Sequence, residues 1–358
     1  MGKQTILYKN YNEYAKIIDF HGWDLPIQFT SILGEVNSVR SDVGMFDVSH
    51  MGRIMCEGEA VIDFLNYLLT GELNKLSINQ ASYMFLCDSN SGIIDDLVAY
   101  KISDYKIMIV CNAGNKDDVV NVLKTHRSSN LKYGSLIIND FTNNSGMIAV
   151  QGPNSPMILN KLFESKFENI KRFNFASILK DNHEVIISRT GYTGEVGYEI
   201  ITNLELSSSI WDKLINLNVT PCGLGSRDVL RIEAGLSLHG NEITSDINPY
   251  EAELSRFVNN DKQSVYSRSW NNIINTATKK MLIGFIINGR GIPRSNNSII
   301  YNGESIGYVT SGTFSPTLGT PIGLGFINRN IGQGSSIQVD IRGKKIAAII
   351  TKIPFLRR

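Results

Sequence analysis

Apolar residues recur every three or four positions in several segments, which is the spacing of an amphipathic helix. The clearest case runs from Glu59 to Leu69, where valine, isoleucine, phenylalanine and leucine are interleaved with polar side chains. Helix-like patterns also occur over residues 11–20, 30–42, 116–127, 155–163, 205–217 and 221–235. We expect a helix in each of these places.

Shorter apolar runs bounded by turn-forming residues predict β-strands between these helices. One runs up to about Cys56, and the others cover residues 81–87, 93–101, 106–111, 135–140, 146–151, 184–188 and 196–202. Hairpins mixed with helices in this way are typical of an α+β fold and not of a doubly wound sheet.

The pattern changes after about residue 275. From Lys279 on, every segment is a short β-like run interrupted by glycine, asparagine or proline. The expected strands cover residues 282–287, 298–301, 305–311, 322–327, 336–341 and 345–352. This spacing predicts a small all-β module. Residues 255–278, rich in asparagine, serine and lysine, would join it to the rest of the chain.

Overall charge does not point to a polyanionic partner. The 35 lysines and arginines balance 34 aspartates and glutamates to a net charge of +1, whereas binding to nucleic acid needs clustered basic side chains. No apolar run approaches the ~20 residues of a membrane span. The first residues resemble neither a signal peptide nor a transit peptide. We expect a cytoplasmic protein without a nucleic-acid or membrane partner.

The four cysteines are Cys56, Cys87, Cys111 and Cys222. They are far apart, and none has the spacing to a second cysteine or a histidine that metal sites and redox pairs require. We therefore expect buried thiols in a reducing compartment and no bound metal.

Two adjacent carboxylates, Asp95 and Asp96, interrupt an apolar strand over residues 91–100. Burying a charge is costly unless the charge is paired or faces a cavity. Side chains alternate along a strand, so only one of the two can enter a given pocket. The pattern alone also fits two acids that cap a turn or pair with arginines.

Glycines at 191, 194 and 197 surround aromatic residues and the acids Glu195 and Glu199. This spacing is not that of a phosphate-binding loop. Such glycines could let the backbone approach a flat ligand closely. A nearby carboxylate could then accept hydrogen bonds from the edge of that ligand. A glycine-bulged hairpin with solvated acids explains the spacing equally well.

Arg227 and Arg231 share one face of the helix predicted over residues 221–235. An arginine there could bind a ligand carboxylate, but internal salt bridges are the commoner arrangement. His21, His50 and His239 have no ligand spacing, and we interpret each as structural. The sequence has no nucleophile elbow.

Taken together, the motifs of the chain resemble the aminomethyltransferase, or T-protein, family of the glycine cleavage system. The resemblance runs nearly from end to end. It rests on His21–Pro26, Val39–Arg40, Gly44–Gly52, Gly92–Leu97, Arg189–Glu195, Gly223–Asp228, Arg231–Gly235, Pro293–Arg294 and Val309–Leu318.

The resemblance implies an α+β protein of three domains in a cloverleaf-like arrangement around a central folate channel. Two mixed α/β lobes would form the folate-binding region of residues 1–275, with residues 1–50 and 140–250 in one lobe and 51–139 in the other. Residues 279–358 would form an all-β lobe, a barrel or jelly-roll-like domain.

The resemblance also implies an enzyme of glycine catabolism and one-carbon metabolism. Members of the family take the aminomethyl group from the lipoyl arm of the H-protein, release ammonia and leave the carbon on tetrahydrofolate, a co-substrate. Two alternatives stay open at this point. One is another folate-dependent demethylase, and the other is a non-catalytic folate-binding protein of iron–sulfur maintenance.

Site residues follow from the same resemblance. Asp96 matches the catalytic acid, which would orient the attacking folate nitrogen and stabilise positive charge on the aminomethyl carbon. Glu199 matches the carboxylate that accepts the two-donor edge of the pterin, and Arg227 the group near the glutamyl tail. The remaining expected pocket residues are Met51, Tyr83, Asn112 and Tyr192.

The chain departs from the family pattern near its join. Glu253 and Phe257 stand where relatives usually have glycine and tryptophan, and residues 261–266 replace another usual segment. The tail after Phe355 lacks the common aromatic residue. None of these changes touches the residues expected to carry the chemistry.

Overall fold

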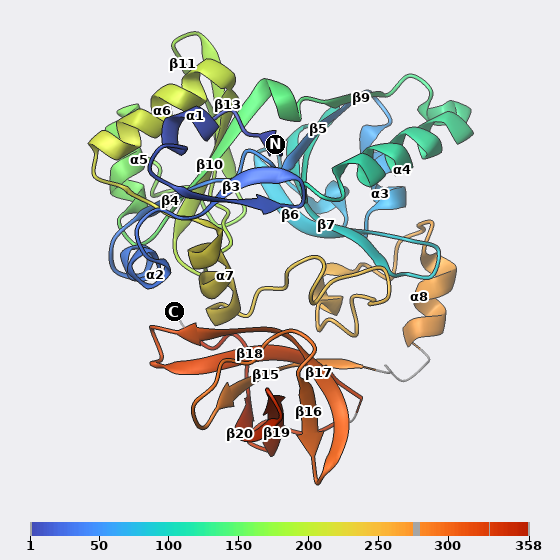
Figure 1. Ribbon diagram of the computed structural model, residues 1–358. Coiled ribbons are helices and arrows are strands. Elements are labelled where there is room, and N and C mark those ends of the chain that lie inside the picture. The colour runs from blue at the N-terminus through green and yellow to red at the C-terminus, as the bar shows by residue number, and fades with distance from the viewer. Residues whose placement is uncertain (1, 275–279, 329, 357–358) are drawn as a thin grey trace. The chain divides into compact units, whose positions relative to one another are not determined.

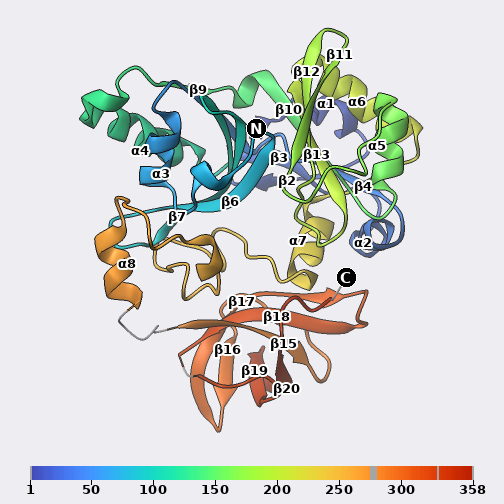
Figure 2. The same ribbon diagram turned by 180° about the vertical axis from the view of Figure 1, so that it is seen from behind.

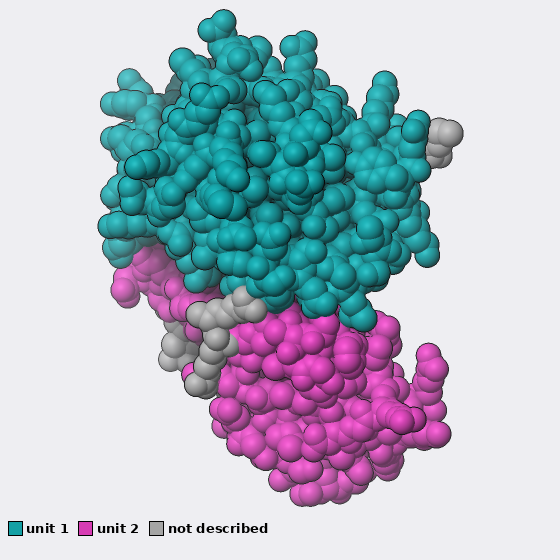
Figure 3. Space-filling view, turned by 90° about the vertical axis from the view of Figure 1, so that its left-hand side faces the viewer, with its two compact units in different colours: residues 1–86, 96–227 teal, residues 87–95, 228–358 magenta. Residues whose placement is uncertain are grey.

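The computed structural model describes residues 2–274, 280–328 and 330–356. The chain divides into two compact units (Figure 3). Unit 1 consists of residues 1–86 and 96–227, and unit 2 of residues 87–95 and 228–358. Within the described residues, no helix is both long and apolar enough to cross a membrane.

Unit 1 contains a six-stranded sheet in the order β11-β12-β13-β10-β4-β14. Its strands are β4 (Gly44–Asp47), β10 (Ser145–Gln151), β11 (Phe175–Lys180), β12 (His183–Ser188), β13 (Gly197–Asn203) and β14 (Thr220–Pro221). Helices α5 (Ser155–Phe163) and α6 (Leu204–Asn216) pack against this sheet, as Figure 1 shows. The core between them includes the fully buried Trp211.

A second sheet of five strands has the order β6-β7-β8-β5-β9 (Figure 2). Its strands are β5 (Gly52–Glu57), β6 (Gln80–Cys87), β7 (Ile93–Ser103), β8 (Lys106–Cys111) and β9 (Ile137–Asp140). Helix α3 (Val61–Leu68) contacts β8, and α4 (Lys116–Ser129) contacts β9. Along β7, Asp95 is fully buried and Asp96 half-buried. The expectation that the two acids face opposite sides is therefore confirmed.

The helix expected over residues 11–20 is wrong. Helix α1 ends at Tyr11 (Tyr8–Tyr11), and Lys16–Phe20 forms β2, which pairs with β3 (Trp23–Gln28). His21 and Gly22 take φ of 50° and 81°, which reverses the chain between the two strands. Strand β1 (Lys3–Gln4) completes this small sheet, and α2 (Ile32–Ser41) forms as expected.

In unit 2, six strands close a barrel in the order β15-β18-β17-β16-β19-β20. They are β15 (Met281–Ile287), β16 (Ser298–Tyr301), β17 (Glu304–Ser315), β18 (Thr320–Ile327), β19 (Ser336–Ile341) and β20 (Lys344–Thr351). Buried isoleucines and valines fill the interior. A mixed α/β chain with a C-terminal β-barrel, as the sequence predicts, is confirmed.

The sequence pattern did not predict helix α8 (Ser267–Ile274). It also did not predict the strands β1, β3, β4, β11 and β14. Helix α7 (Leu224–Glu233) forms where a helix is expected. The 3-10 helices are Leu73–Lys75, Leu131–Tyr133, Thr142–Asn144 and Ser255–Phe257. The division into three domains stays a prediction, and its boundary at residues 275–279 lies outside the described residues.

Candidate functional site

Four of the predicted site residues lie in a row across the five-stranded sheet. Tyr83 is on β6, Asp96 on β7, Asn112 directly follows β8, and Met51 directly precedes β5. These strands are neighbours in that order. All four side chains are half-buried, so the row lies on an accessible face of the sheet.

The strand register explains why these residues meet. Val98 of β7 is opposite Val110 of β8, so Asp96 comes opposite Asn112 two residues further on. Cys111 is opposite Gly52 of β5, which by the same extension brings Met51 opposite Asn112. Directly opposite residues point to the same face of a sheet.

Both carboxylate oxygens of Asp96 are hydrogen-bonded. The Tyr83 hydroxyl donates to Oδ2 at 2.8 Å, and the Asn112 amide donates to Oδ1 at 2.7 Å. The same amide donates to the Asp96 carbonyl at 3.1 Å. Two donors, Tyr83 on β6 and Asn112 directly after β8, therefore fix the orientation of the carboxylate.

A buried arginine fixes the turn that carries Met51. Arg53 is fully buried, and its guanidinium donates to the Met51 carbonyl at 2.6 Å. It also donates to the Ser145 hydroxyl at 2.8 Å and to the Thr142 carbonyl at 2.6 Å. Burial lowers the pKa of Arg53 to about 10. Arg53 thus ties the start of β5 to the segment before β10.

A second group of predicted residues surrounds Glu199 on β13. Glu199 is buried and accepts a hydrogen bond from the Thr190 hydroxyl. Burial raises the pKa of Glu199, and the Thr190 hydrogen bond and the charge of Arg227 oppose that rise. The hydroxyl of Tyr100 lies 3.4 Å from Thr190 Oγ1. Tyr100 and Asp96 share one face of β7, about 13 Å apart along the strand.

Arg227 lies in the first turn of α7 with its guanidinium over aromatic rings. The guanidinium carbon is 4.9 Å from the centre of the Tyr192 ring and 6.0 Å from that of Phe46. In the part of the chain that the structure describes, the side chain makes no hydrogen bond, although its Nη1 is covered from solvent. Burial lowers the pKa of Arg227, and Glu199 opposes this effect.

His50, which lies close enough to Arg227 and Arg53 to be affected by their charges, also has an unpartnered polar atom. Only 5 % of its surface is exposed, and its Nδ1 has no hydrogen-bond partner among the described residues. Burial lowers the pKa of His50 to about 3, and the charges of Arg227 and Arg53 add to the effect. The imidazole is therefore neutral at physiological pH. A buried polar group without a partner costs about 1–3 kcal/mol, so this is unusual for a purely structural histidine.

The glycine-rich segment before β13 packs around Gln151. A side chain at Gly191 or Gly197 would come within 2.1 or 2.4 Å of the Gln151 amide. That amide donates to the Thr190 carbonyl at 3.2 Å and accepts from the Thr193 hydroxyl at 2.9 Å. These two glycines therefore allow close packing on Gln151, and the packed loop presents Tyr192.

Arg40 anchors the same loop. Its guanidinium donates to the Thr193 carbonyl at 2.7 Å and pairs with Glu195 at 2.8 Å. Glu195 is therefore held in an internal ion pair. Gln151, Thr190 and Arg40 are not among the individual site residues that the sequence predicts. A polar residue that ends an apolar strand, as Gln151 does, is the signal that could have found the first of them.

Arg231 lies one helical turn after Arg227 but belongs to unit 2 and has a different environment. It is buried and pairs with Glu242 at 2.9 Å, while its Nη2 donates to the Ser311 hydroxyl at 2.6 Å. It also pairs with Asp228 at 2.9 Å. Internal salt bridging, the commoner arrangement for an arginine, is therefore confirmed for Arg231.

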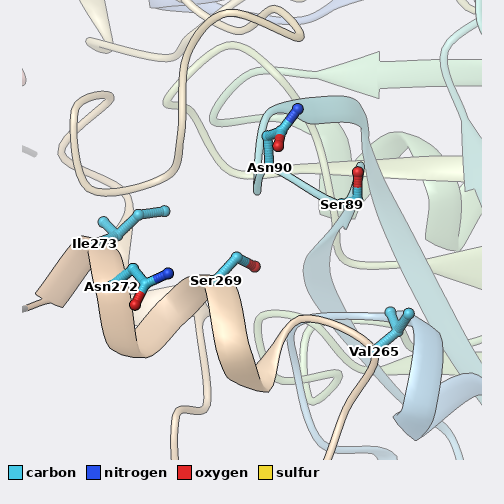
Figure 4. A pocket seen from close by; sticks show the side chains of 6 residues that line it. All are labelled: Ser89, Asn90, Val265, Ser269, Asn272 and Ile273. Atoms are coloured by element: carbon cyan, nitrogen blue, oxygen red, sulfur yellow. The ribbon is translucent and has the colours of Figure 1, made fainter.

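Unit 2 contains a cavity of about 380 Å³. Figure 4 shows Ser89 and Asn90 on a loop, and Ser269 and Asn272 on α8. Val265 and Ile273 complete the lining. None of the predicted site residues lines this cavity, and none of its lining side chains is charged, so it offers no group for the expected chemistry.

Comparison with known proteins gives the same family over both parts of the chain. The GCVT N-terminal domain model matches residues 7–262, and the glycine cleavage T-protein C-terminal barrel domain model matches residues 280–356. An aminomethyltransferase of Thermosipho melanesiensis is 40% identical over 357 residues, which are 99% of this chain and 97% of the relative. One of Caldanaerobacter subterraneus subsp. tengcongensis is 41% identical over 364 residues, covering 99% and 96%.

A solved structure agrees with the sequence relatives. The glycine cleavage system aminomethyltransferase T from Bartonella henselae superposes with a TM-score of 0.93 at 29% sequence identity. The match covers 99% of this chain and 98% of that one. The chain therefore belongs to the aminomethyltransferase, or glycine cleavage T-protein, family.

Proposed function

We propose that this chain is the aminomethyltransferase of a glycine cleavage system. It transfers the methylene carbon of the aminomethyl group on the lipoyl arm of the H-protein to tetrahydrofolate, and ammonia leaves. Similarity over the full length to aminomethyltransferases supports this activity. The same similarity favours it over the demethylase and iron–sulfur alternatives.

Asp96 is the proposed catalytic residue, and its two fixed hydrogen bonds are the observation that carries the proposal. During the transfer, two bonds of the carbon break, and positive charge develops on the carbon. The amine nitrogen leaves as ammonia, and the lipoyl sulfur leaves as a thiol. A carboxylate already held in place stabilises that charge without reorganisation. Tetrahydrofolate supplies two nucleophilic nitrogens that form the two new bonds to the carbon, and their protons go to the departing ammonia and thiol. The charge and position of Asp96 matter more than proton abstraction, because aspartate is a modest base.

The groups around Glu199 fit a folate, and we assign them to its binding. A buried carboxylate suits the two-donor edge of a pterin, and the Tyr192 ring suits a flat ligand. Arg227 has charged donors that no described residue uses, which suits an oxygen acceptor of the same ligand. Tyr83, Asn112 and Met51 would line the space beside Asp96.

The compartment belongs to the same proposal. The four cysteines are buried and free in the structure. A reducing compartment keeps such thiols unmodified. We place the chain in the cytoplasm, with the lipoylated H-protein as its protein partner.

The proposal is tested by ammonia release from aminomethylated H-protein. With this chain present, release should rise with tetrahydrofolate concentration until it saturates. An H-protein without its lipoyl arm should yield no ammonia and serves as the control. Release that is equally fast without tetrahydrofolate, or absent with it, would overturn the proposed function.

A further inference from the structure

Glu35 of α2 is a fully buried carboxylate without a counter-charge. It forms no salt bridge with any described residue, and hydrogen-bond donors take the place of a cation. Oε1 accepts from the backbone N–H of Phe29 at 2.7 Å and of Thr30 at 3.2 Å. Oε2 accepts from the Gly223 N–H at 2.9 Å and the Ser226 hydroxyl at 2.8 Å.

These bonds connect Glu35 to the start of α7. Gly223 directly precedes the helix, and Ser226 is in its first turn. A side chain at Gly223 would come within 2.3 Å of the Ile27 carbonyl, so the two segments approach closely. A negative charge at this end of a helix is also favoured by the helix dipole. Glu35 therefore fixes where α7 begins.

Arg227 directly follows Ser226, and its side chain has no hydrogen bond of its own to a described residue. Apart from contact with the aromatic rings of Tyr192 and Phe46, its position depends on the backbone of this first turn. Because no internal hydrogen bond holds this guanidinium, the helix backbone must set its position for ligand binding.

We propose that Glu35 is a positioning residue that holds Arg227 in place for folate binding. The inference rests on the proposed folate contact of Arg227. Glu35 does not touch the folate and acts through the first turn of α7.

Replacement of Glu35 by glutamine tests this role. A glutamine has the same shape, but its one acceptor oxygen cannot serve both pairs of donors. The KM for tetrahydrofolate should rise about tenfold while kcat stays within about twofold, because Asp96 is untouched. In an Arg227→Met background the same change should have no further effect on tetrahydrofolate affinity, since coupled residues are not additive.

A milder variant decides the question if Glu35→Gln does not fold. Ser226→Ala removes one of the four bonds to Glu35 and should raise the KM about threefold. Ser207→Ala is the matched control, because Ser207 is also a buried serine early in a helix and donates to the Asn203 carbonyl at 2.6 Å. It should leave the KM unchanged.

The outcomes separate the two proposals. Equal effects of the two serine variants on KM, or a Glu35→Gln effect that persists in the Arg227→Met background, would overturn the positioning role. If Arg227→Met itself leaves tetrahydrofolate affinity unchanged, the folate contact of Arg227 fails instead. A loss of thermal stability without a change in KM would assign Glu35 a structural role only.

Discussion

The two groups of site residues in unit 1 differ in how their charges are satisfied. Asp96 has a protein donor on each carboxylate oxygen, at 2.8 and 2.7 Å. Arg227 donates to no acceptor within the described part of the chain, and the Nδ1 of neighbouring His50 also lacks a partner there. The group around Asp96 has its hydrogen bonds satisfied by the protein, whereas the group around Arg227 has polar atoms without a partner among the described residues.

This difference indicates different tasks. A charge that must act on a transition state benefits from being fixed before the substrate arrives. A group that must recognise a ligand keeps its donors unused, because an internal partner would compete with the ligand. Unused buried donors cost stability. The satisfied group therefore suits chemistry and the unsatisfied group suits binding.

Asp96→Asn should give the largest effect, because it removes the fixed charge and keeps the shape. We expect kcat to fall by roughly 10²–10⁴-fold while tetrahydrofolate affinity changes little. Ammonia-release rates measure the first quantity and an equilibrium titration the second. Asp118→Asn, the same change at an exposed position of α4, is the control. Unchanged turnover would remove Asp96 from the mechanism.

Arg227→Met should have its main effect on tetrahydrofolate affinity, whereas Asp96→Asn should affect turnover. Tetrahydrofolate affinity should fall about 30-fold, the cost of a lost charged hydrogen bond. The melting temperature of the free protein should not fall, since the guanidinium makes no hydrogen bond with described residues. Titration and thermal unfolding measure the two quantities. A clear loss of stability with normal affinity would show that Arg227 is structural and would contradict the comparison.

Tyr83→Phe should have a smaller effect, because it removes one of the two side-chain donors to Asp96 and keeps the ring. We expect kcat to fall about tenfold, which corresponds to about 1.4 kcal/mol for a hydrogen bond to a charged group. Steady-state ammonia release at saturating tetrahydrofolate is the measurement. A change confined to the KM would place Tyr83 in binding instead of in the support of Asp96.

The sequence predicted the row around Asp96 better than it predicted its surroundings. Alternation along β7 separates Asp95 from Asp96, and this local rule holds in the structure. The hydrogen-bond partners of Asp96 come from neighbouring strands, so local sequence patterns do not identify them. Tyr83 and Asn112 were predicted only from the resemblance to a known family. Glu35 lies about 190 positions from its partner Gly223 and carries no local signal.

The failed predictions have a similar cause. Residues 16–20 have no intrinsic strand pattern strong enough to exclude a helix, and pairing with β3 decides their structure. The φ of 59° at Glu253 accounts for the glycine that the resemblance leads us to expect there, but it does not account for the glutamate of this chain. The family's usual glycine fits that conformation without strain.

Glu199→Gln should give the smallest effect and tests whether the binding group costs stability. Because burial raises the pKa of Glu199 in the folded protein, its charge is disfavoured there, and this penalty grows as pH rises through the unfolded and then the folded pKa. At low pH the carboxyl is protonated in both states and the penalty disappears. The variant should therefore melt a few degrees higher than the wild type near pH 7 and at the same temperature near pH 4.

Folate affinity should change in the opposite direction at neutral pH. Glutamine offers one acceptor and one donor where the proposed pterin edge needs two acceptors, so binding should weaken as stability rises. Glu13→Gln, the same change at an exposed position, should alter neither quantity. A variant that is less stable than the wild type at pH 7 would mean that the charge of Glu199 is balanced within the protein, as that of Asp96 is. Glu199 would then belong with the satisfied group, and the contrast between the two groups would depend on Arg227 and His50 alone.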